Sequence, residues 1–214
     1  MSYSLCLFDL DGTLTNPKEG ITKSVQYALA RFGIEVENLD TLVDFIGPPL
    51  RESFQKFYGF SPEQAEQAIA AYREYYTRQG IFENELYEGC DRLLGTLARR
   101  GVRMAMATSK PAVFAEKIAV HYNIRQYFDF IAGSELDGTR DRKSEVILHA
   151  LLNVDPTQSL RRVMIGDRKH DVQGAKQTDT DCIGVTWGYG SRQELETAGA
   201  LYTVDTINQL LDLL

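Results

Sequence analysis

The sequence has few cysteines, few histidines and no long apolar run. Its 214 residues include only three cysteines, Cys6, Cys90 and Cys182, which are far apart and odd in number. No pair has the spacing of a metal site or a redox motif, so the cysteines predict a reducing compartment rather than a disulfide framework. The three histidines form no cluster that would indicate zinc. Because no apolar run approaches the length of a membrane span and the N-terminus carries no targeting pattern, we expect a cytoplasmic protein.

Positive charge is also scarce, because the formal net charge is −7 and basic residues form no large cluster. Nucleic acids and anionic membrane surfaces attract clusters of Lys and Arg, so neither is an expected partner. The length suits one sizeable domain or a domain with an insertion. We expect a monomer or a small homo-oligomer that acts on a small molecule.

Most of the chain alternates between short apolar runs and longer helical patterns. This alternation predicts an α/β domain with a doubly wound parallel sheet and helices on both of its faces. The predicted strands are 4–9, 102–107, 128–132, 162–166 and 182–186. The predicted helices are 89–100, 112–122, 142–152, 169–177, 191–198 and a final helix at 206–214.

The alternation stops between residues 16 and 85, where no strand is predicted. Helical patterns cover 20–33, 39–47, 50–59 and 61–80, and each of them ends at a glycine. The last begins with a capping box, in which Ser61 is the N-cap, Pro62 follows and Gln64 is the partner. We therefore predict an all-helical cap domain at 16–85, inserted into a core domain formed by 1–15 and 86–214.

Two acids follow the first predicted strand, in the stretch FDLDGTLT. Acids are poor strand formers and are costly to bury without a partner. Backbone alternation places Asp9 and Asp11 on the same side of the chain, and Gly12 permits a tight turn. The stretch is either a polar turn or a pair of acids that does chemistry.

Polar side chains also lie near the ends of other predicted strands. In open parallel sheets, ligands bind beyond the carboxyl ends of the strands. Thr108 and Ser109 lie just before a helix that has Pro111 in its predicted first turn. They form either an anion site or a plain helix cap. Lys143 lies at the start of the next helix, where a cation is disfavoured, although a solvated lysine remains an alternative.

Two further acids, Asp167 and Asp171, lie four residues apart at the opening of a helix. They either cap that helix or share a face at a site. Together with Asp9 and Asp11 they form four carboxylates that would repel one another at close range. A Mg²⁺ ion removes that conflict, especially when a phosphate oxygen is also a ligand. The hydroxyls, amides and lysine would then bind the phosphate.

The stretches FDLDGTLT, ATSK, Lys143 and GDRKHD resemble, in this order, the four motifs of the phosphatase branch of the haloacid dehalogenase superfamily. The resemblance spans almost the entire chain and includes a helical cap between the first and second motifs. The nearest subgroup is the phosphoglycolate phosphatase-like one. Within it, FDLDGTLTNPKEGI, IGPPL and GDRKHDVQGAK are similar to bacterial members described as 5′-nucleotidases.

The resemblance implies a Mg²⁺-dependent phosphomonoesterase that works through an aspartyl-phosphate. Asp9 would be the nucleophile, and Asp11 would protonate the leaving group and then deprotonate the attacking water. The metal ligands would be the Asp9 carboxylate, the Asp11 backbone carbonyl and the Asp167 carboxylate. Asp171 would orient waters or Asp167 without itself binding the ion.

The resemblance also implies a phosphate site and a choice of substrate. Thr108, Lys143 and the amides of Ser109 and Gly12 would bind the transferring phosphoryl group. Arg51, in the IGPPLRESF stretch of the cap, could reach an anionic group of the substrate or simply be a solvated residue. A 5′-nucleotide is the first expected substrate and phosphoglycolate the second. A sugar-phosphate mutase, which returns the phosphoryl group to a sugar, is an alternative of another class.

Overall fold

A computed structural model describes residues 3–214, which divide into two compact units. One unit comprises the chain up to Asn16 together with Leu86–Leu214, and the other is Pro17–Glu85. A two-stranded sheet, formed by β2 (Thr15–Asn16) and β3 (Glu85–Leu86), lies at the two chain crossings. The prediction of no strand between 16 and 85 was therefore wrong for one residue at each end.

The larger unit is built on a six-stranded sheet with the order β5-β4-β1-β6-β7-β8, in which every pairing is parallel. The doubly wound α/β fold is thereby confirmed. All four residues of β1 are buried, as expected for a central strand covered on both faces. The strands are β1 (Leu5–Phe8), β4 (Arg103–Pro111), β5 (Phe130–Ser134), β6 (Arg162–Gly166), β7 (Asp181–Val185) and β8 (Tyr202–Val204).

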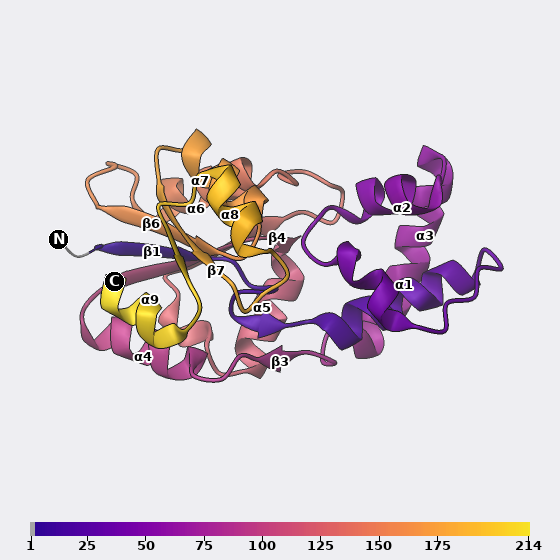
Figure 1. Cartoon of the computed structure of the whole chain (residues 1–214), viewed down its shortest axis with the longest axis horizontal. Helices are drawn as coiled ribbons and strands as arrows, with labels where there is room; N and C mark the ends of the chain where they lie inside the picture. The colour runs from indigo at the N-terminus through magenta and orange to yellow at the C-terminus, as the bar shows by residue number, and fades with distance from the viewer. Residues whose placement is uncertain (1–2) are drawn as a thin grey trace. The chain divides into compact units, whose positions relative to one another are not determined.

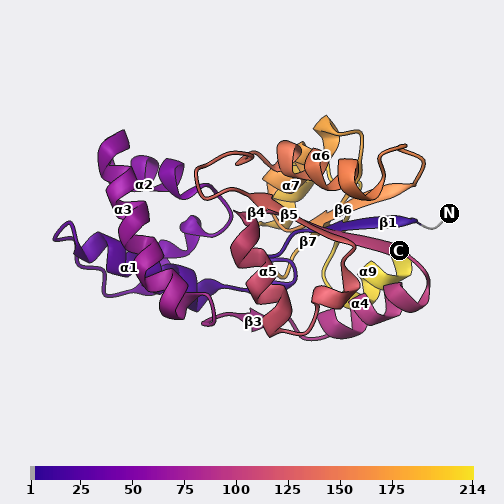
Figure 2. The same ribbon diagram turned by 180° about the vertical axis from the view of Figure 1, so that it is seen from behind.

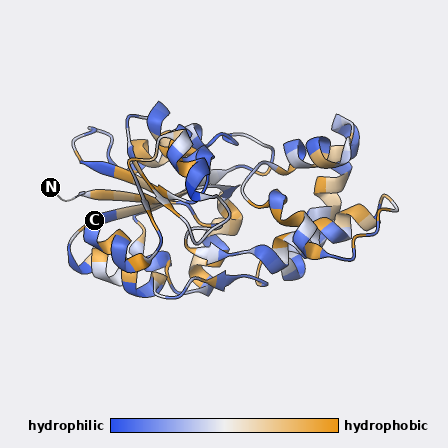
Figure 3. Ribbon diagram, in the orientation of Figure 1, coloured by the Kyte–Doolittle hydropathy of each residue, from blue (hydrophilic) through white to orange (hydrophobic). Residues whose placement is uncertain are grey.

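Helices cover both faces of this sheet, as Figures 1 and 2 show from opposite sides. The strands between them carry mostly hydrophobic residues (Figure 3). One face carries α6 (Lys143–Val154), α7 (Lys169–Gln177) and α8 (Arg192–Ala198), and the other carries α4 (Cys90–Arg99), α5 (Ala112–His121) and α9 (Ile207–Leu213). A short 3₁₀ turn, Arg125–Tyr127, precedes β5. Within residues 3–214, none of the helices combines the length and apolar character needed to cross a membrane.

The smaller unit contains α1 (Lys18–Ala30), α2 (Leu50–Tyr58) and α3 (Pro62–Tyr75), and a π-helical turn follows at Tyr76–Gly80. The capping box of α3 forms as predicted, because the Ser61 side chain accepts from the Gln64 amide. The segment predicted as a helix at 39–47 is a 3₁₀ helix, Leu39–Phe45. Here the Asn38 side chain accepts from the Asp40 amide at 2.9 Å, and such local bonds compete with an α-helical pattern.

Candidate active site

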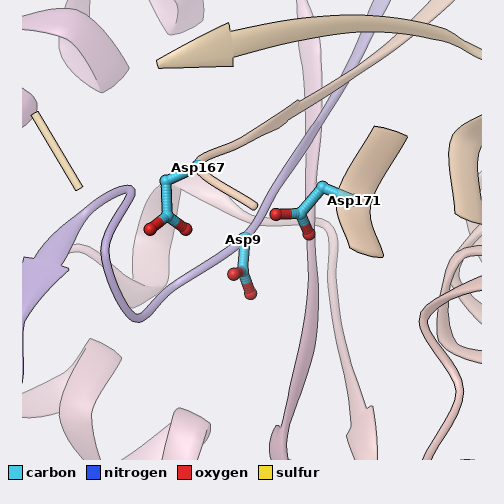
Figure 4. Close-up of side chains that lie close together, drawn as sticks. All are labelled: Asp9, Asp167 and Asp171. Atoms are coloured by element: carbon cyan, nitrogen blue, oxygen red, sulfur yellow. The ribbon is translucent and has the colours of Figure 1, made fainter. Parts of the chain in front are cut away.

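Three buried acids meet at the carboxyl ends of two neighbouring strands. Asp9 directly follows β1, and its amide donates to Ile165 O of β6 at 2.9 Å. Asp167 directly follows β6, and Asp171 lies in the first turn of α7. Oxygens of Asp9, Asp167 and Asp171 all lie within 4.8 Å of one another, and their side chains converge in Figure 4. Adjacent parallel strands end at the same edge, and this places the acids together.

Glycines and a backbone amide enclose Asp167. Gly12 has a φ of +84°, and a Cβ there would overlap the Asp167 carboxylate. A Cβ on Gly188 would overlap Asp167 Cβ, and one on Gly190 would overlap the Asp167 carbonyl oxygen. The Tyr189 amide donates to Asp167 Oδ2 at 2.7 Å. The loop after β7 therefore packs directly on this acid and fixes its carboxylate, a contact that the sequence did not reveal.

Lys143 is the first residue of α6 and is 7% exposed, so the alternative of a solvated lysine was wrong. Its Nζ lies 2.8 Å from Asp9 Oδ1 and 2.7 Å from Asp171 Oδ1, and it also donates to Ala107 O at 3.2 Å. Burial opposes the charge on Lys143, but the carboxylates of Asp171 and Asp9 outweigh it and raise its pKa. One cation thus bridges the acid after β1 and the acid on α7.

A bulge near the end of β4 carries Thr108 and Ser109, the predicted phosphate-binding pair. Ala107 pairs with Ala132 and Pro111 pairs with Ser134, so β4 has two more residues than β5 over the same interval. The Ser134 hydroxyl donates to Ser109 O at 2.8 Å and holds the bulge. The bulge contains Thr108 and Ser109 and bends the strand end, a common device next to active sites. Helix α5 begins only after Pro111, which is therefore not in its first turn as predicted.

Lys110, in the same bulge, is a site residue that the sequence reasoning missed. Its Nζ forms an ion pair with Asp11 Oδ2, and the two side chains are 6% and 11% exposed. Its amide donates to Thr108 Oγ1 at 3.2 Å. Burial raises the pKa of Asp11, and the Lys110 ammonium partly offsets this effect. The available signal was backbone alternation, which places residue 110 on the same side of an extended chain as residue 108.

The charges of this site do not balance within the protein. The four predicted acids would carry four negative charges if all were ionised, and the lysines paired with them, Lys143 and Lys110, supply two positive ones. Burial, followed by repulsion from Asp171 and Asp9, raises the pKa of Asp167 well above its ordinary value. Asp167 Oδ1 is buried and has no hydrogen-bond partner among residues 3–214. An excess of two negative charges and an unbonded carboxylate oxygen fit a hard divalent cation such as Mg²⁺.

The predicted metal ligands differ in whether their carboxylates belong to the group of converging acids. The carboxylates of Asp9 and Asp167 belong to the converging group, and the Asp171 carboxylate also lies within it. Asp171 is ion-paired to Lys143 and accepts from the Arg168 amide at 3.0 Å, which agrees with an orienting role. The Asp11 carboxylate contacts Lys110 through Oδ2, and the metal contact through the Asp11 backbone carbonyl stays a prediction.

Arg51, the candidate for substrate selection, belongs to α2 of the smaller unit. Its Nη2 lies 2.6 Å from Glu66 Oε1, and about half of each side chain is exposed. Exposed pairs of this kind contribute little to stability, about 0–1 kcal/mol. Arg51 therefore remains accessible to an anionic group, and its role stays a prediction.

Comparison with known proteins gives consistent matches over nearly the full chain. A family model described as haloacid dehalogenase-like hydrolase matches residues 6–185. A 5′-nucleotidase of Pseudomonas aeruginosa is 49% identical over 91% of this chain and 88% of its own length. The tyrosine-protein kinase PtkA of Mycobacterium tuberculosis is 43% identical over 88% of this chain, which spans 64% of that relative. Phosphoglycolate phosphatases of other bacteria match at 27% identity.

Solved structures agree with these matches. The crystal structure of a predicted phosphatase from Clostridium acetobutylicum superimposes with a TM-score of 0.92. That protein is 46% identical, and the match covers 98% of this chain and 97% of the other. The similarity therefore extends over nearly the whole chain.

Proposed function

Because the chain belongs to the haloacid dehalogenase-like hydrolase family, we propose that it is a Mg²⁺-dependent phosphomonoesterase. The observation that carries this proposal is the buried Asp9 carboxylate, 2.8 Å from Lys143 Nζ and two residues before a second acid. A nucleophile beside a cation, followed by a candidate proton donor, suits attack on phosphorus.

The reaction would proceed in two displacements. A carboxylate oxygen of Asp9 attacks phosphorus, and the bond from phosphorus to the leaving oxygen breaks. The Asp11 carboxyl gives its proton to that oxygen as it departs. The Asp11 carboxylate then takes a proton from a water molecule, which attacks the aspartyl-phosphate, releases phosphate and restores Asp9.

The other site residues would bind and orient the phosphoryl group. The Thr108 hydroxyl, the Lys143 ammonium and the amides of Ser109 and Gly12 would hold its oxygens, where charge is distributed in the transition state. Mg²⁺, held by Asp9, Asp167 and the Asp11 carbonyl, would supply positive charge against those same oxygens. Asp171 would keep Lys143 and its neighbours in place through the ion pair at 2.7 Å.

A nucleoside 5′-monophosphate is the substrate we propose first, and phosphoglycolate is the second. The 49% identity to a 5′-nucleotidase supports the first choice. We also propose a cytoplasmic location, which the three buried free cysteines support because thiols persist in reducing compartments.

A second candidate function is transfer of the phosphoryl group to an acceptor other than water. The 43% identity to a tyrosine-protein kinase favours this candidate, although that relative is longer than this chain. A sugar-phosphate mutase, the alternative predicted from the sequence, would use the same aspartyl-phosphate. These activities differ from hydrolysis only in what accepts the phosphoryl group from Asp9.

The deciding experiment measures phosphate release by the purified protein with Mg²⁺. The panel contains 5′-nucleotides, phosphoglycolate, sugar phosphates and pyrophosphate, and each is repeated with EDTA. Preferential release from nucleotides that EDTA abolishes would support the proposal. Full activity in EDTA would refute the metal site. No release from any compound, with phosphate label recovered on a sugar or on a protein tyrosine, would favour the second candidate.

A further inference from the structure

Lys110 lies in the bulge of β4 and pairs with Asp11, but the proposed mechanism gives it no role. We propose that Lys110 is a positioning residue for Asp11: it holds Asp11 Oδ2 and leaves Asp11 Oδ1 as the atom that exchanges protons with the leaving group and with water. The inference rests on the proposed function, because it concerns the proton transfers of that reaction.

The bulge is what brings Lys110 to Asp11. Four steps along β4, from Ala107 to Pro111, correspond to two steps along β5. A Cβ on Gly133 of β5 would lie only 2.5 Å from Lys110 O, so the bulge can pack here because that position lacks a side chain. The same loop carries Thr108, whose hydroxyl accepts from the Lys110 amide. The Thr108 hydroxyl, proposed to bind phosphate, and the cation that contacts Asp11 are therefore part of the same bulge.

The two oxygens of Asp11 have different surroundings. Oδ2 is paired with Lys110 Nζ, whereas Oδ1 is buried and has no hydrogen-bond partner among residues 3–214. Buried polar atoms in stable folds are nearly always bonded, so an unbonded carboxylate oxygen beside the nucleophile indicates a place for another molecule. With Oδ2 fixed, rotation of the carboxylate is restricted and Oδ1 keeps one direction.

Stability gives no adequate reason for this pair. A buried ion pair often adds nothing to stability compared with apolar residues of the same size, because both charges lose their hydration. The acids on the other side of the site, Asp9 and Asp171, already pair with Lys143. An orientation role for Asp11 accounts for both the burial of Lys110 and its choice of one oxygen.

The test compares two kinds of leaving group in the first turnover. A nucleotide or another alkyl phosphate releases an alkoxide that needs a proton, whereas p-nitrophenyl phosphate releases a stable phenolate that does not. In Lys110→Met we expect the first-turnover rate on the alkyl phosphate to fall about 100-fold or more, the usual range for a lost general acid. The burst of p-nitrophenolate should change less than about tenfold, and Lys110→Arg should recover part of the loss. Lys117→Met, at an exposed position of α5, is the matched control that should leave both rates unchanged.

A double-mutant cycle separates positioning from a general structural effect. If Lys110 acts through Asp11, adding Lys110→Met to Asp11→Asn should cost less than about twofold beyond Asp11→Asn alone. The Asp11→Asn background also keeps the test valid if Lys110→Met alone fails to fold. In the double variant the Asp11 carboxylate, which Lys110→Met would leave buried without a cation, is replaced by a neutral amide. If Lys110→Met alone fails to fold, Lys110→Arg replaces Lys110→Met in both the single and the double variant, so that the cycle stays closed.

Each remaining outcome overturns the inference. Equal loss on both leaving groups would make Lys110 a phosphate-binding or structural residue, and so would a further large loss in the double variant. A wild-type protein that hydrolyses phosphomonoesters, with an inactive Asp9→Asn variant and an unaffected Lys110→Met variant, would refute this inference alone. A wild-type protein without phosphate release would refute the proposed function and this inference together.

Discussion

Lys143 forms ion pairs with two buried acids at the same time. Its Nζ lies within 2.8 Å of Asp9 Oδ1 and 2.7 Å of Asp171 Oδ1. The same ammonium therefore contacts the proposed nucleophile and the acid on α7, and it lies close enough to Asp9 to contact a phosphoryl group that arrives there.

Replacing Asp9 tests its role as nucleophile. We expect Asp9→Asn to reduce kcat by about 10³-fold or more, because the covalent step loses its attacking group. The amide keeps the size of the side chain, so the circular dichroism spectrum and Tm should change little. Asp212→Asn, at an exposed position of α9, is the control and should retain full activity. Residual activity above about one hundredth of wild type would count against Asp9 as the nucleophile.

Removing the lysine tests the charge balance. Lys143→Met should lower the free energy of unfolding at pH 7 by about 3–5 kcal/mol, because it leaves two buried carboxylates without a cation. Burial already raises the pKa of Asp171 to about 6 against the opposing effect of Lys143. Without Lys143 that pKa rises further, so the folded state holds more protons than the unfolded state between about pH 4 and 7.

The stability defect of Lys143→Met should therefore shrink as the pH falls from 7 to 5. Urea unfolding in EDTA at the two pH values measures it against wild type. Lys169→Met, at an exposed position two residues before Asp171, controls for the loss of a nearby positive charge. A defect of equal size at both pH values would show that packing, rather than the unpaired acids, causes the loss.

Residues that conflict with their local surroundings were the predictable ones. Asp9 and Asp11 follow an apolar strand, so they indicated a functional site in the sequence, whereas Lys143 entered the predicted site only in combination with the other motifs. Lys110 conflicts with nothing nearby in the chain. Its partner lies 99 residues away, and the bulge that directs it depends on a glycine of the next strand.

At the scale of elements, the loop after β7 acts as a support for Asp167. Gly188 lies against both Gly12 O and Asp167 Cβ with no room for a side chain. The adjacent Trp187 donates from its indole nitrogen to Thr13 O at 3.0 Å, which ties the loop to the turn after β1. Two strand ends that are far apart in sequence are thus packed against the same acid.

A single added methyl group tests this support. Gly188→Ala should move the loop or Asp167, lower kcat by about 100-fold, and raise the Mg²⁺ concentration needed for activity, because a displacement of about 1 Å is costly at an active site. Gly95→Ala is the matched control: its Cβ would meet Arg99 Nη1 at an ordinary 3.5 Å within α4. That control should keep its activity and gain about 0.5–1 kcal/mol of stability. Normal activity in Gly188→Ala would contradict the proposed support.

Elements with a strong local pattern were predictable, and short or bent ones were not. The five predicted strands all occur in the sheet, but β8 has only three residues and an exposed Tyr202, so it lacks an apolar run. Helical spacing at 39–47 led to an α-helix where the chain forms a 3₁₀ helix. Strand β8 depends on its pairing with β7, whereas the 3₁₀ helix has a local side-chain bond at its start that competes with the α-helical pattern.

At the scale of the whole molecule, the proposed chemistry belongs to one unit. The acids, both lysines and Thr108 lie in the unit formed by the chain up to Asn16 and Leu86–Leu214, whereas Arg51 lies in Pro17–Glu85. The chain connects the two units near residues 16 and 85, where β2 and β3 form their short sheet. Substrate selection by Arg51 would therefore be separable from phosphoryl transfer, with a change in KM rather than in the chemical step.

Binding of Mg²⁺ should stabilise the protein in a pH-dependent way. Burial and the neighbouring carboxylates raise the pKa of Asp167 and bring that of Asp171 to about 6. In EDTA, the folded state therefore binds more protons than the unfolded state between about pH 4 and 6, and this contribution to stability falls as the pH rises. Mg²⁺ replaces those protons, so it should raise Tm more at pH 7 than at pH 5.

Mass action sets how much Mg²⁺ stabilises the folded state. The free energy of unfolding should rise by about 2.7 kcal/mol when free Mg²⁺ is about 100 times its Kd. Differential scanning calorimetry at pH 5 and pH 7, with EDTA or with Mg²⁺, measures it. In Asp167→Asn the response to Mg²⁺ should disappear, and the Tm in EDTA at pH 7 should rise above that of wild type, because one buried charge is gone. An equal Mg²⁺ response at both pH values, or an undiminished response in Asp167→Asn, would place the ion somewhere other than at the proposed ligands Asp9, Asp11 and Asp167.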